Sequence, residues 1–279
     1  MFHVEEMRAA DFPFAVQLAN TMDWNMAEED FEFMLKLEPH GCFVLFSESE
    51  RVGIATSVSY GRVGWFGNLI VKEAFRQKGA GPLLVKHAAD FLRKQGVQTV
   101  GLYAYQNLIG FYQKLGFKLD ADFSVLHAKA VDCQAGGTLE EADERLFPSL
   151  IEFDRECFSG NRKKLLEPIL LSQGNLCYVS MDGDKVFGFV AAKVYGEMAE
   201  VGPLVCHRNR ADIAVSLLKA ILSKLRNIEV HICLPSDETA LLETLNQAGF
   251  TEDFRVTRMF LGPATAKPCI YVAESLERG

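Results

Sequence analysis

The hexapeptide RQKGAG at residues 76–81 has the residue types of a phosphate-binding turn. It lies between the apolar run WFGNLIV and the run PLLVKHAADFLRK, whose apolar spacing predicts a helix. Because Gly79 and Gly81 lack Cβ atoms, a ligand can approach their backbone, and N–H groups at a helix start attract phosphate. Arg76 and Lys78 can add positive charge, although Lys78 is equally consistent with a solvated loop cation.

Two familiar nucleotide-binding motifs do not account for this loop. The Walker form GxxxxGK[ST] is absent from the chain. A dinucleotide fingerprint would place an acidic residue about 20 positions further on, where this chain reads TVGLY. The loop therefore predicts a phosphate-bearing ligand of another kind.

The elements that would position the loop are predicted by the same region. Apolar runs predict strands at 65–71 and 97–104, with a helix from about Gly81 to Lys94 between them. A further helix leads to Gly116. This order predicts a mixed α/β fold with a central sheet flanked by helices.

The loop and the strand before it resemble the GNAT superfamily of acyl-CoA-dependent N-acyltransferases. The family motif is a strand that ends L-x-V, four further residues, and then [RQ]-x-x-G-x-[GA] at the start of a helix. Leu69, Val71, Arg76, Gly79 and Gly81 fit this motif.

A second family motif follows at the expected separation. Members carry an Asn, a Tyr five residues later, and then Lys-x-Gly-Phe, which Asn107, Tyr112, Lys114, Gly116 and Phe117 match in NLIGFYQKLGF. Two motifs at the right distance make the resemblance specific for the first part of the chain.

The resemblance implies that acetyl-CoA is the cosubstrate and that its pyrophosphate lies on the glycine loop. The strands at 65–71 and 97–104 would diverge, with the pantetheine arm between them and an amide near Ile70 or Val71 polarising the thioester carbonyl. The residues that we expect to contact the coenzyme are Leu69, Ile70, Val71, Arg76, Gln77, Lys78, Gly79, Ala80, Gly81, Asn107 and Tyr112.

Amine attack on a thioester expels a thiolate, which leaves more easily once protonated. The resemblance assigns this proton transfer to Tyr112, whose alternative role is that of a packed aromatic side chain. Asn107 would contact the coenzyme or cap a helix. Trp24 and Asn25 lie in the segment that shapes the acceptor pocket in such folds, although Trp24 also fits a partly buried structural role.

The general base has no clear candidate. An amine with a pKa of about 10 is mostly protonated at pH 7, so its proton must be removed before attack. Many family members use a Glu on one of the two diverging strands, but GRVGWFGNLIV and VQTVGLYA contain no carboxylate. The base is a water relay or an acidic residue near the first helices, where Asp23, Glu28, Glu29 and Asp30 equally suit a helix dipole. It stays unassigned.

The chain repeats itself with a shift of 135 residues. Without a gap, CFVLFSESERVGIATSVSYG at 42–61 aligns with CYVSMDGDKVFGFVAAKVYG at 177–196. We predict two tandem GNAT-like domains: a first copy at 1–130 with the acetyl-CoA site, and a second copy at 138–279. The joint lies near AVDCQAGGT, where two glycines break the pattern.

The second copy has lost the residues expected to hold the coenzyme. Its loop reads CHRNRADIAVSLLKAIL, where Ile213 or Val215 would obstruct a pyrophosphate, and Leu245 replaces the tyrosine. We expect a degenerate domain that completes the acceptor pocket, binds a regulator or stabilises the first copy. The basic run at 162–164 would meet an anionic group or form a solvated helix face.

Composition limits the partners and the compartment. The net charge of −8 argues against nucleic acid or an anionic membrane as a partner, and no apolar run approaches the roughly 18 residues of a membrane helix. A cytoplasmic location is predicted. Seven scattered cysteines without a CxxC pair predict reduced thiols, with neither a disulfide framework nor a metal site, and the histidines show no ligand spacing.

The sequence therefore predicts an N-acetyltransferase that transfers an acetyl group from acetyl-CoA to a primary amine. The alternative is a non-catalytic acetyl-CoA-sensing module whose second copy binds a partner. The missing carboxylates favour the sensor, whereas Tyr112 favours the enzyme. The acceptor, a small-molecule or peptide amine, and the oligomeric state are left open.

Overall fold

The structure is a computed structural model that describes residues 1–129, 131, 133, 139–265 and 269–279. The predicted joint near 130–138 therefore lies largely outside the described residues.

The first copy contains β1 (Phe2–Glu6), α1 (Phe12–Asn20), α2 (Glu28–Leu37), β2 (Cys42–Ser47), β3 (Glu50–Ser59), β4 (Val63–Val71), α3 (Ala80–Lys94), β5 (Thr99–Tyr105), α4 (Ile109–Lys114) and β6 (Lys118–Ala128).

The second copy repeats this order after a short first strand. It contains β7 (Glu140–Glu141), α5 (Phe147–Phe158), α6 (Lys163–Leu171), β8 (Leu176–Asp182), β9 (Lys185–Tyr195), β10 (Met198–His207), α7 (Ala211–Leu222), β11 (Glu229–Pro235), α8 (Thr239–Gln247), β12 (Thr251–Leu261) and β13 (Cys269–Val272). The series β2 to β6 corresponds element by element to the series β8 to β12, so the internal repeat predicted from the sequence is confirmed. Among the described elements of the first copy, none corresponds to β13.

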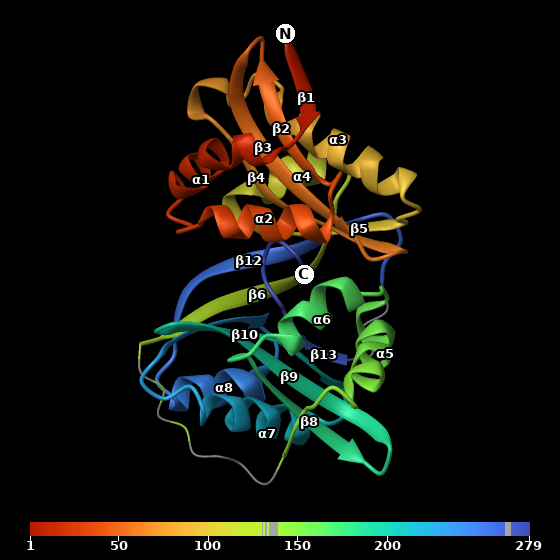
Figure 1. Ribbon diagram of the computed structural model, residues 1–279, viewed down its shortest axis with the longest axis vertical. Coiled ribbons are helices and arrows are strands. Elements are labelled where there is room, and N and C mark those ends of the chain that lie inside the picture. The colour runs from red at the N-terminus through yellow and green to blue at the C-terminus, as the bar shows by residue number, and fades with distance from the viewer. Residues whose placement is uncertain (130, 132, 134–138, 266–268) are drawn as a thin grey trace.

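The two copies exchange their last long strands. The strands form one sheet in the order β1-β2-β3-β4-β5-β12-β6-β11-β10-β9-β8-β7, with β13 on β10. Strand β12 of the second copy pairs with β5 and β6, whereas β6 of the first copy pairs with β11 and β12. Figure 1 shows β6 and β12 crossing together between the two halves. The sheet is therefore continuous through the whole molecule.

Helices cover both faces of the sheet in the first copy. Alternate side chains of β2 enter different cores: Cys42 and Val44 pack with α1 and α2, whereas Phe43 and Leu45 pack with α3. The nearly continuous apolar runs seen in the sequence follow from this two-sided burial. In the second copy α7 and α8 pack into one core and α5 into another. No helix of the described residues is long and apolar enough to cross a membrane.

The C-terminal segment, residues 274–279, is held between the two copies (Figure 1). The Tyr60 hydroxyl donates a hydrogen bond to the carbonyl of Arg278 at 3.0 Å, and Trp65 Nε1 donates to the carbonyl of Leu276 at 3.1 Å. These donors come from the first copy, so the segment links the end of the second copy to the first.

Arg162 also holds the C-terminal segment and is not on a solvated face. Its side chain is fully buried, is paired with Asp154 through two hydrogen bonds of 2.5 and 3.1 Å, and donates to the carbonyl of Gly279 at 2.8 Å. The anionic group that this arginine meets is therefore Asp154 of the same copy. The neighbouring Lys163 is exposed.

The prediction of reduced thiols is wrong for one pair of cysteines. Cys157 at the end of α5 and Cys269 at the start of β13 form a disulfide, although 112 residues separate them. Only the tertiary fold brings them together, so their spacing along the chain gave no sign of the bond. The other five cysteines, Cys42, Cys133, Cys177, Cys206 and Cys233, are buried thiols.

Candidate active site

Strands β4 and β5 diverge and open a cleft of about 140 Å³, which we call the β4–β5 cleft. The two strands pair in parallel only from Val63 to Trp65. Beyond this point β4 carries a bulge, since Thr56 faces Gly67 while Ile54 faces Ile70, which leaves two residues opposite one. The bulge directs β4 away from β5, as the resemblance implied for this pair of strands.

Aromatic and aliphatic side chains make up most of the cleft wall. The lining residues are Met22, Trp24, Phe66, Gly67, Asn68, Leu69, Leu102, Tyr103, Ala104, Tyr105, Leu108, Tyr112, Val256, Leu276 and Glu277. They come from the α1–α2 connection, β4, β5, the short 3-10 helix Gln106–Leu108, α4, β12 and the C-terminal segment. Both copies therefore contribute to the cleft.

The glycine loop opens α3 with unpaired amides. Gly79 precedes the helix at φ +88°, a left-handed conformation that strongly favours glycine, and Gln77 also has a positive φ of +62°. A Cβ at Gly81 would lie 3.3 Å from the ring of Phe111. Within the described chain, no hydrogen bond from the amides of 77–81 is found. These donors lie at a helix N-terminus, where they suit a phosphate.

The two cations of the loop have different contacts. Arg76 Nε donates to the carbonyl of Val71 at 2.9 Å, which ties the loop to the end of β4. The Lys78 ammonium lies 5.6 Å from the ring centroid of Phe75. Both side chains are exposed beside the loop, so they add positive charge near the free amides.

Tyr112 lies in α4 and forms part of the cleft wall. Its ring packs against those of Phe111 and Phe117, and its hydroxyl makes no hydrogen bond with any described residue. Burial raises the pKa of Tyr112 well above its usual range. The hydroxyl therefore stays protonated at neutral pH. Asn107 is exposed and does not cap α4, which begins after Leu108 without a side-chain cap.

Trp24 reaches the cleft, whereas its neighbour Asn25 is not among the lining residues. Trp24 Nε1 donates to the Tyr105 hydroxyl at 3.0 Å, which connects the α1–α2 segment to β5. Asn25 is exposed at φ +48°. The four acidic residues near the first helices, Asp23, Glu28, Glu29 and Asp30, are also not among the residues that line the cleft.

Sequence reasoning missed the contribution of the C-terminal segment. Leu276 and Glu277 line the cleft beside Gly67 of β4. They are far from the glycine loop in sequence, and their segment, ESLERG, matches no motif of the family. Only the fold of the second copy brings them to the first.

Comparison with known families identifies both copies. Residues 4–117 match the acetyltransferase (GNAT) family, and residues 150–270 match a second description, acetyltransferase (GNAT) domain. The chain carries two GNAT domains. The first GNAT domain contains the β4–β5 cleft and the glycine loop, and the matches support an acyltransferase.

Solved structures with the same tandem architecture cover nearly all of the chain. A candidate acetyltransferase from Pyrococcus horikoshii aligns with a TM-score of 0.82 and 21% identity, over 100% of this chain and 96% of its own. A GCN5-related N-acetyltransferase from Sphaerobacter thermophilus aligns at 0.67 and 16%, over 95% and 97%. A tandem GNAT protein from the clavulanic acid biosynthesis pathway aligns at 0.64 and 15%, over 95% and 100%. These likenesses establish the fold.

A curated relative matches a smaller part of the chain. It is the uncharacterized protein YyaT of Bacillus subtilis, which is 23% identical over 95 residues. The match covers 34% of this chain and 64% of the relative, slightly less than two thirds of its length.

In the second GNAT domain, β13 fills the gap that corresponds to the β4–β5 cleft. Strands β10 and β11 pair only from Met198 to Val201. Beyond this point β13 pairs with β10 from Leu204 to His207, and the Ala273 amide donates to the carbonyl of Cys233 on β11. The chain itself thus lies between the two diverging strands.

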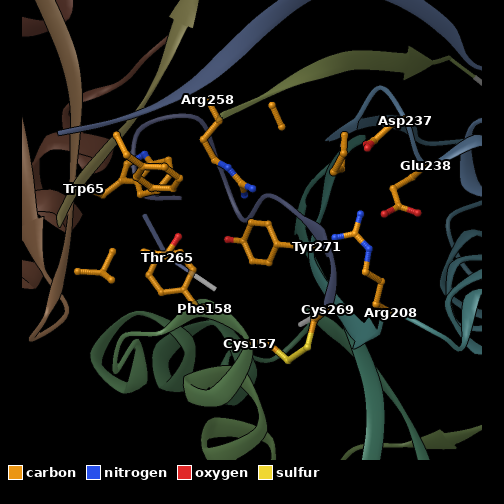
Figure 2. Close-up of a pocket in the computed structure, with 14 residues that line it drawn as sticks. Trp65, Cys157, Phe158, Arg208, Asp237, Glu238, Arg258, Thr265, Cys269 and Tyr271 are labelled. Atoms are coloured by element: carbon orange, nitrogen blue, oxygen red, sulfur yellow. A yellow bond between two sulfur atoms is a disulfide. The ribbon is translucent and has the colours of Figure 1, made fainter. Parts of the chain in front are cut away.

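A smaller cavity of about 60 Å³ remains beside β13 (Figure 2). Figure 2 shows the Tyr271 ring between Arg258 and the Cys157–Cys269 disulfide. Arg258 is paired with Asp120 at 2.8 Å. The cavity lies at the boundary between the two domains, and residues 76–81 of the glycine loop line neither this cavity nor the β4–β5 cleft.

Proposed function

We propose that this protein is an acetyl-CoA-dependent N-acetyltransferase whose active site is the β4–β5 cleft of the first GNAT domain. The observation that carries the proposal is the order of three features from the start of α3 through β4 to α4. The free amides of 77–81 open α3, Arg76 ties this loop to the end of β4, and both Leu69 of β4 and Tyr112 of α4 form part of the cleft wall. A pyrophosphate, an extended apolar arm and a departing thiolate suit these features in that order.

The coenzyme contacts follow from this placement. The amides of Gln77, Lys78, Gly79, Ala80 and Gly81 would hold the pyrophosphate, and the exposed side chains of Arg76 and Asn107 would contact the same ligand. Leu69 lines the cleft and would contact the pantetheine arm together with the backbone of the next two residues of β4, Ile70 and Val71. A backbone amide of the bulged strand would polarise the thioester carbonyl as negative charge develops on its oxygen.

Tyr112 would protonate the departing thiolate. A buried phenol with a raised pKa is a weak acid in water, but the thiolate forms in the same apolar cleft, where its own proton affinity also rises. Because the hydroxyl has no other partner among the described residues, it is available to the sulfur atom. The phenol thus keeps its proton until the C–S bond breaks.

The acceptor is a primary amine of a small molecule or peptide. The cleft lining contains several aromatic side chains, including Trp24, Tyr103 and Tyr105, and Glu277 is the one charged residue among the described lining residues. An aromatic wall with a single negative charge favours a cationic amine over an anionic substrate.

The second GNAT domain does not bind the coenzyme in this proposal. The gap between β10 and β11 holds β13, and Leu245 is fully buried in the domain core at the position of Tyr112. The second domain instead contributes β12 and the C-terminal segment to the wall of the active cleft.

A thiol-release assay tests the proposed function. The purified protein is mixed with acetyl-CoA and a panel of polyamines, amino acids, aminoglycosides and lysine peptides. We expect continuous release of the coenzyme A thiol, with acetylated amine in equal amount, for at least one acceptor class. Binding of acetyl-CoA without turnover on any amine would instead indicate an acetyl-CoA sensor whose second domain contacts a partner.

A further inference from the structure

We propose that Glu277 in the C-terminal segment is the general base of the first GNAT domain, an inference that rests on the proposed N-acetyl transfer. Strands β4 and β5 carry no acidic side chain. Glu277 is the one carboxylate among the described residues that line the cleft. The second copy would thus supply the group that the diverging strands of the first copy lack.

Glu277 lies directly against the bulged part of β4. A Cβ built on Gly67 would be 2.6 Å from the Cα of Glu277 and 2.7 Å from its Cβ. No side chain fits between these two backbones, so glycine is required at position 67 for this approach. Glu277 therefore lies beside the strand that would polarise the thioester.

Hydrogen bonds on both sides of Glu277 fix its backbone. The preceding carbonyl, of Leu276, accepts from Trp65 Nε1 at 3.1 Å, and the following carbonyl, of Arg278, accepts from the Tyr60 hydroxyl at 3.0 Å. Trp65 and Tyr60 are both buried. A side chain on so constrained a backbone is positioned before substrate binds.

The carboxylate is partly accessible and has one oxygen without a partner. The Glu277 side chain is 23% exposed, and its Oε1 is paired with the Arg278 guanidinium at 2.5 Å. The described residues offer Oε2 no hydrogen bond. One oxygen is thus held in place while the other can accept a proton.

The surroundings make this carboxylate a stronger base. Burial raises the pKa of Glu277, and Glu200 and Glu274 raise it further, whereas Arg278 and Lys193 oppose the shift. Tyr103 and Tyr105 are the titratable residues of β5 in the cleft. A base with a raised pKa takes a proton from an ammonium group more readily.

The proton and electron balance of the reaction is complete with these groups. Glu277 takes a proton from the bound ammonium, and the nitrogen lone pair then forms the C–N bond at the thioester carbon. As the C–S bond breaks, the electron pair goes to sulfur and the Tyr112 hydroxyl supplies its proton. The acylated nitrogen loses its second proton, which returns through solvent to the Tyr112 oxygen, and Glu277 releases its own proton to solvent.

The test compares Glu277→Gln and Glu277→Asp with wild type on the best amine from the thiol-release assay. Glu243→Gln, an exposed glutamate on α8, is the matched control. For Glu277→Gln at pH 7 we expect kcat to fall about 10²-fold, because a positioned base contributes about that much. Acetyl-CoA affinity should not change, and Glu277→Asp should recover part of the rate.

The pH profile separates a base from a residue that only binds the ammonium. Wild-type kcat/KM should rise with pH as Glu277 loses its proton and then become level. The glutamine variant must use free amine, so its kcat/KM should rise about tenfold per pH unit until the amine pKa near 10. If kcat/KM of Glu277→Gln is lower than wild type by the same factor at every pH, or if only KM changes, the role of Glu277 as a base is overturned.

Gly67→Ala gives an independent test of the position of Glu277. Its Cβ would displace the C-terminal segment, so kcat should fall with the Glu277 side chain still present. Wild-type kcat in both Gly67→Ala and Glu277→Gln would remove Glu277 from the mechanism and leave the transferase proposal intact. A wild-type protein that releases no thiol with any amine would overturn both proposals.

Discussion

At the scale of single residues, the proposed reaction uses two groups with raised pKa values, a phenol that donates a proton and a carboxylate that accepts one. Burial raises the pKa of both Tyr112 and Glu277, with opposite consequences for function. The phenol remains a proton donor throughout the physiological range, whereas the carboxylate becomes a better acceptor. Both groups line one cleft, and the proposed mechanism gives them separate proton-transfer tasks.

Replacing Tyr112 by Phe separates catalysis from packing. The ring contacts with Phe111 and Phe117 remain, and only the hydroxyl is removed. We expect kcat to fall by roughly 10² or more while acetyl-CoA affinity changes little, provided that the chemical step limits turnover. Tyr195→Phe, at an exposed site in the second domain, is the control. A wild-type kcat in folded Tyr112→Phe would exclude Tyr112 as the acid.

At the scale of elements, the glycine loop was predictable because its determinants are adjacent in the chain. The strand, the loop and the helix appear as consecutive patterns, and the structure has them as β4 (Val63–Val71), 77–79 and α3 (Ala80–Lys94). Gly79 lies at the predicted turn with a positive φ. The spacing of residues along the chain was therefore enough to predict the local structure of the glycine loop.

The part of the cleft that Glu277 lines was not predictable in the same way. Glu277 reaches the cleft because β13 lies in the gap between β10 and β11, after which the segment turns toward Trp65 and Tyr60. None of these contacts is local in sequence. The need for glycine at position 67 was also not predictable, because it depends on the C-terminal segment of the second copy, which lies against Gly67 only in the folded protein.

At the scale of the whole molecule, the two domains are interdependent. The repeat revealed two copies, but a repeat cannot show which copy each strand joins. The structure places β12 between β5 and β6 and β6 between β12 and β11. The boundaries of the copies along the chain are therefore not the boundaries of two separate sheets.

This exchange predicts that the halves do not fold separately. A fragment of residues 1–130 would leave β5 with an open edge and β6 without either neighbour. We expect each half, 1–130 and 138–279, to aggregate or to unfold without a cooperative transition, and co-expression to restore a soluble complex. Circular dichroism and denaturant titration would show this. A cooperatively folded 1–130 fragment that binds acetyl-CoA would contradict the prediction.

The most direct test of the central claim is a calorimetric titration with acetyl-CoA of three proteins: wild type, Gly81→Asp, and Ala211→Asp at the equivalent helix start of the second domain. The aspartate at Gly81 would place a negative charge against the pyrophosphate. If the first GNAT domain holds the coenzyme, wild type and Ala211→Asp will show one site per chain, and folded Gly81→Asp will show none. Two sites per chain, or binding that survives in folded Gly81→Asp, would contradict the account.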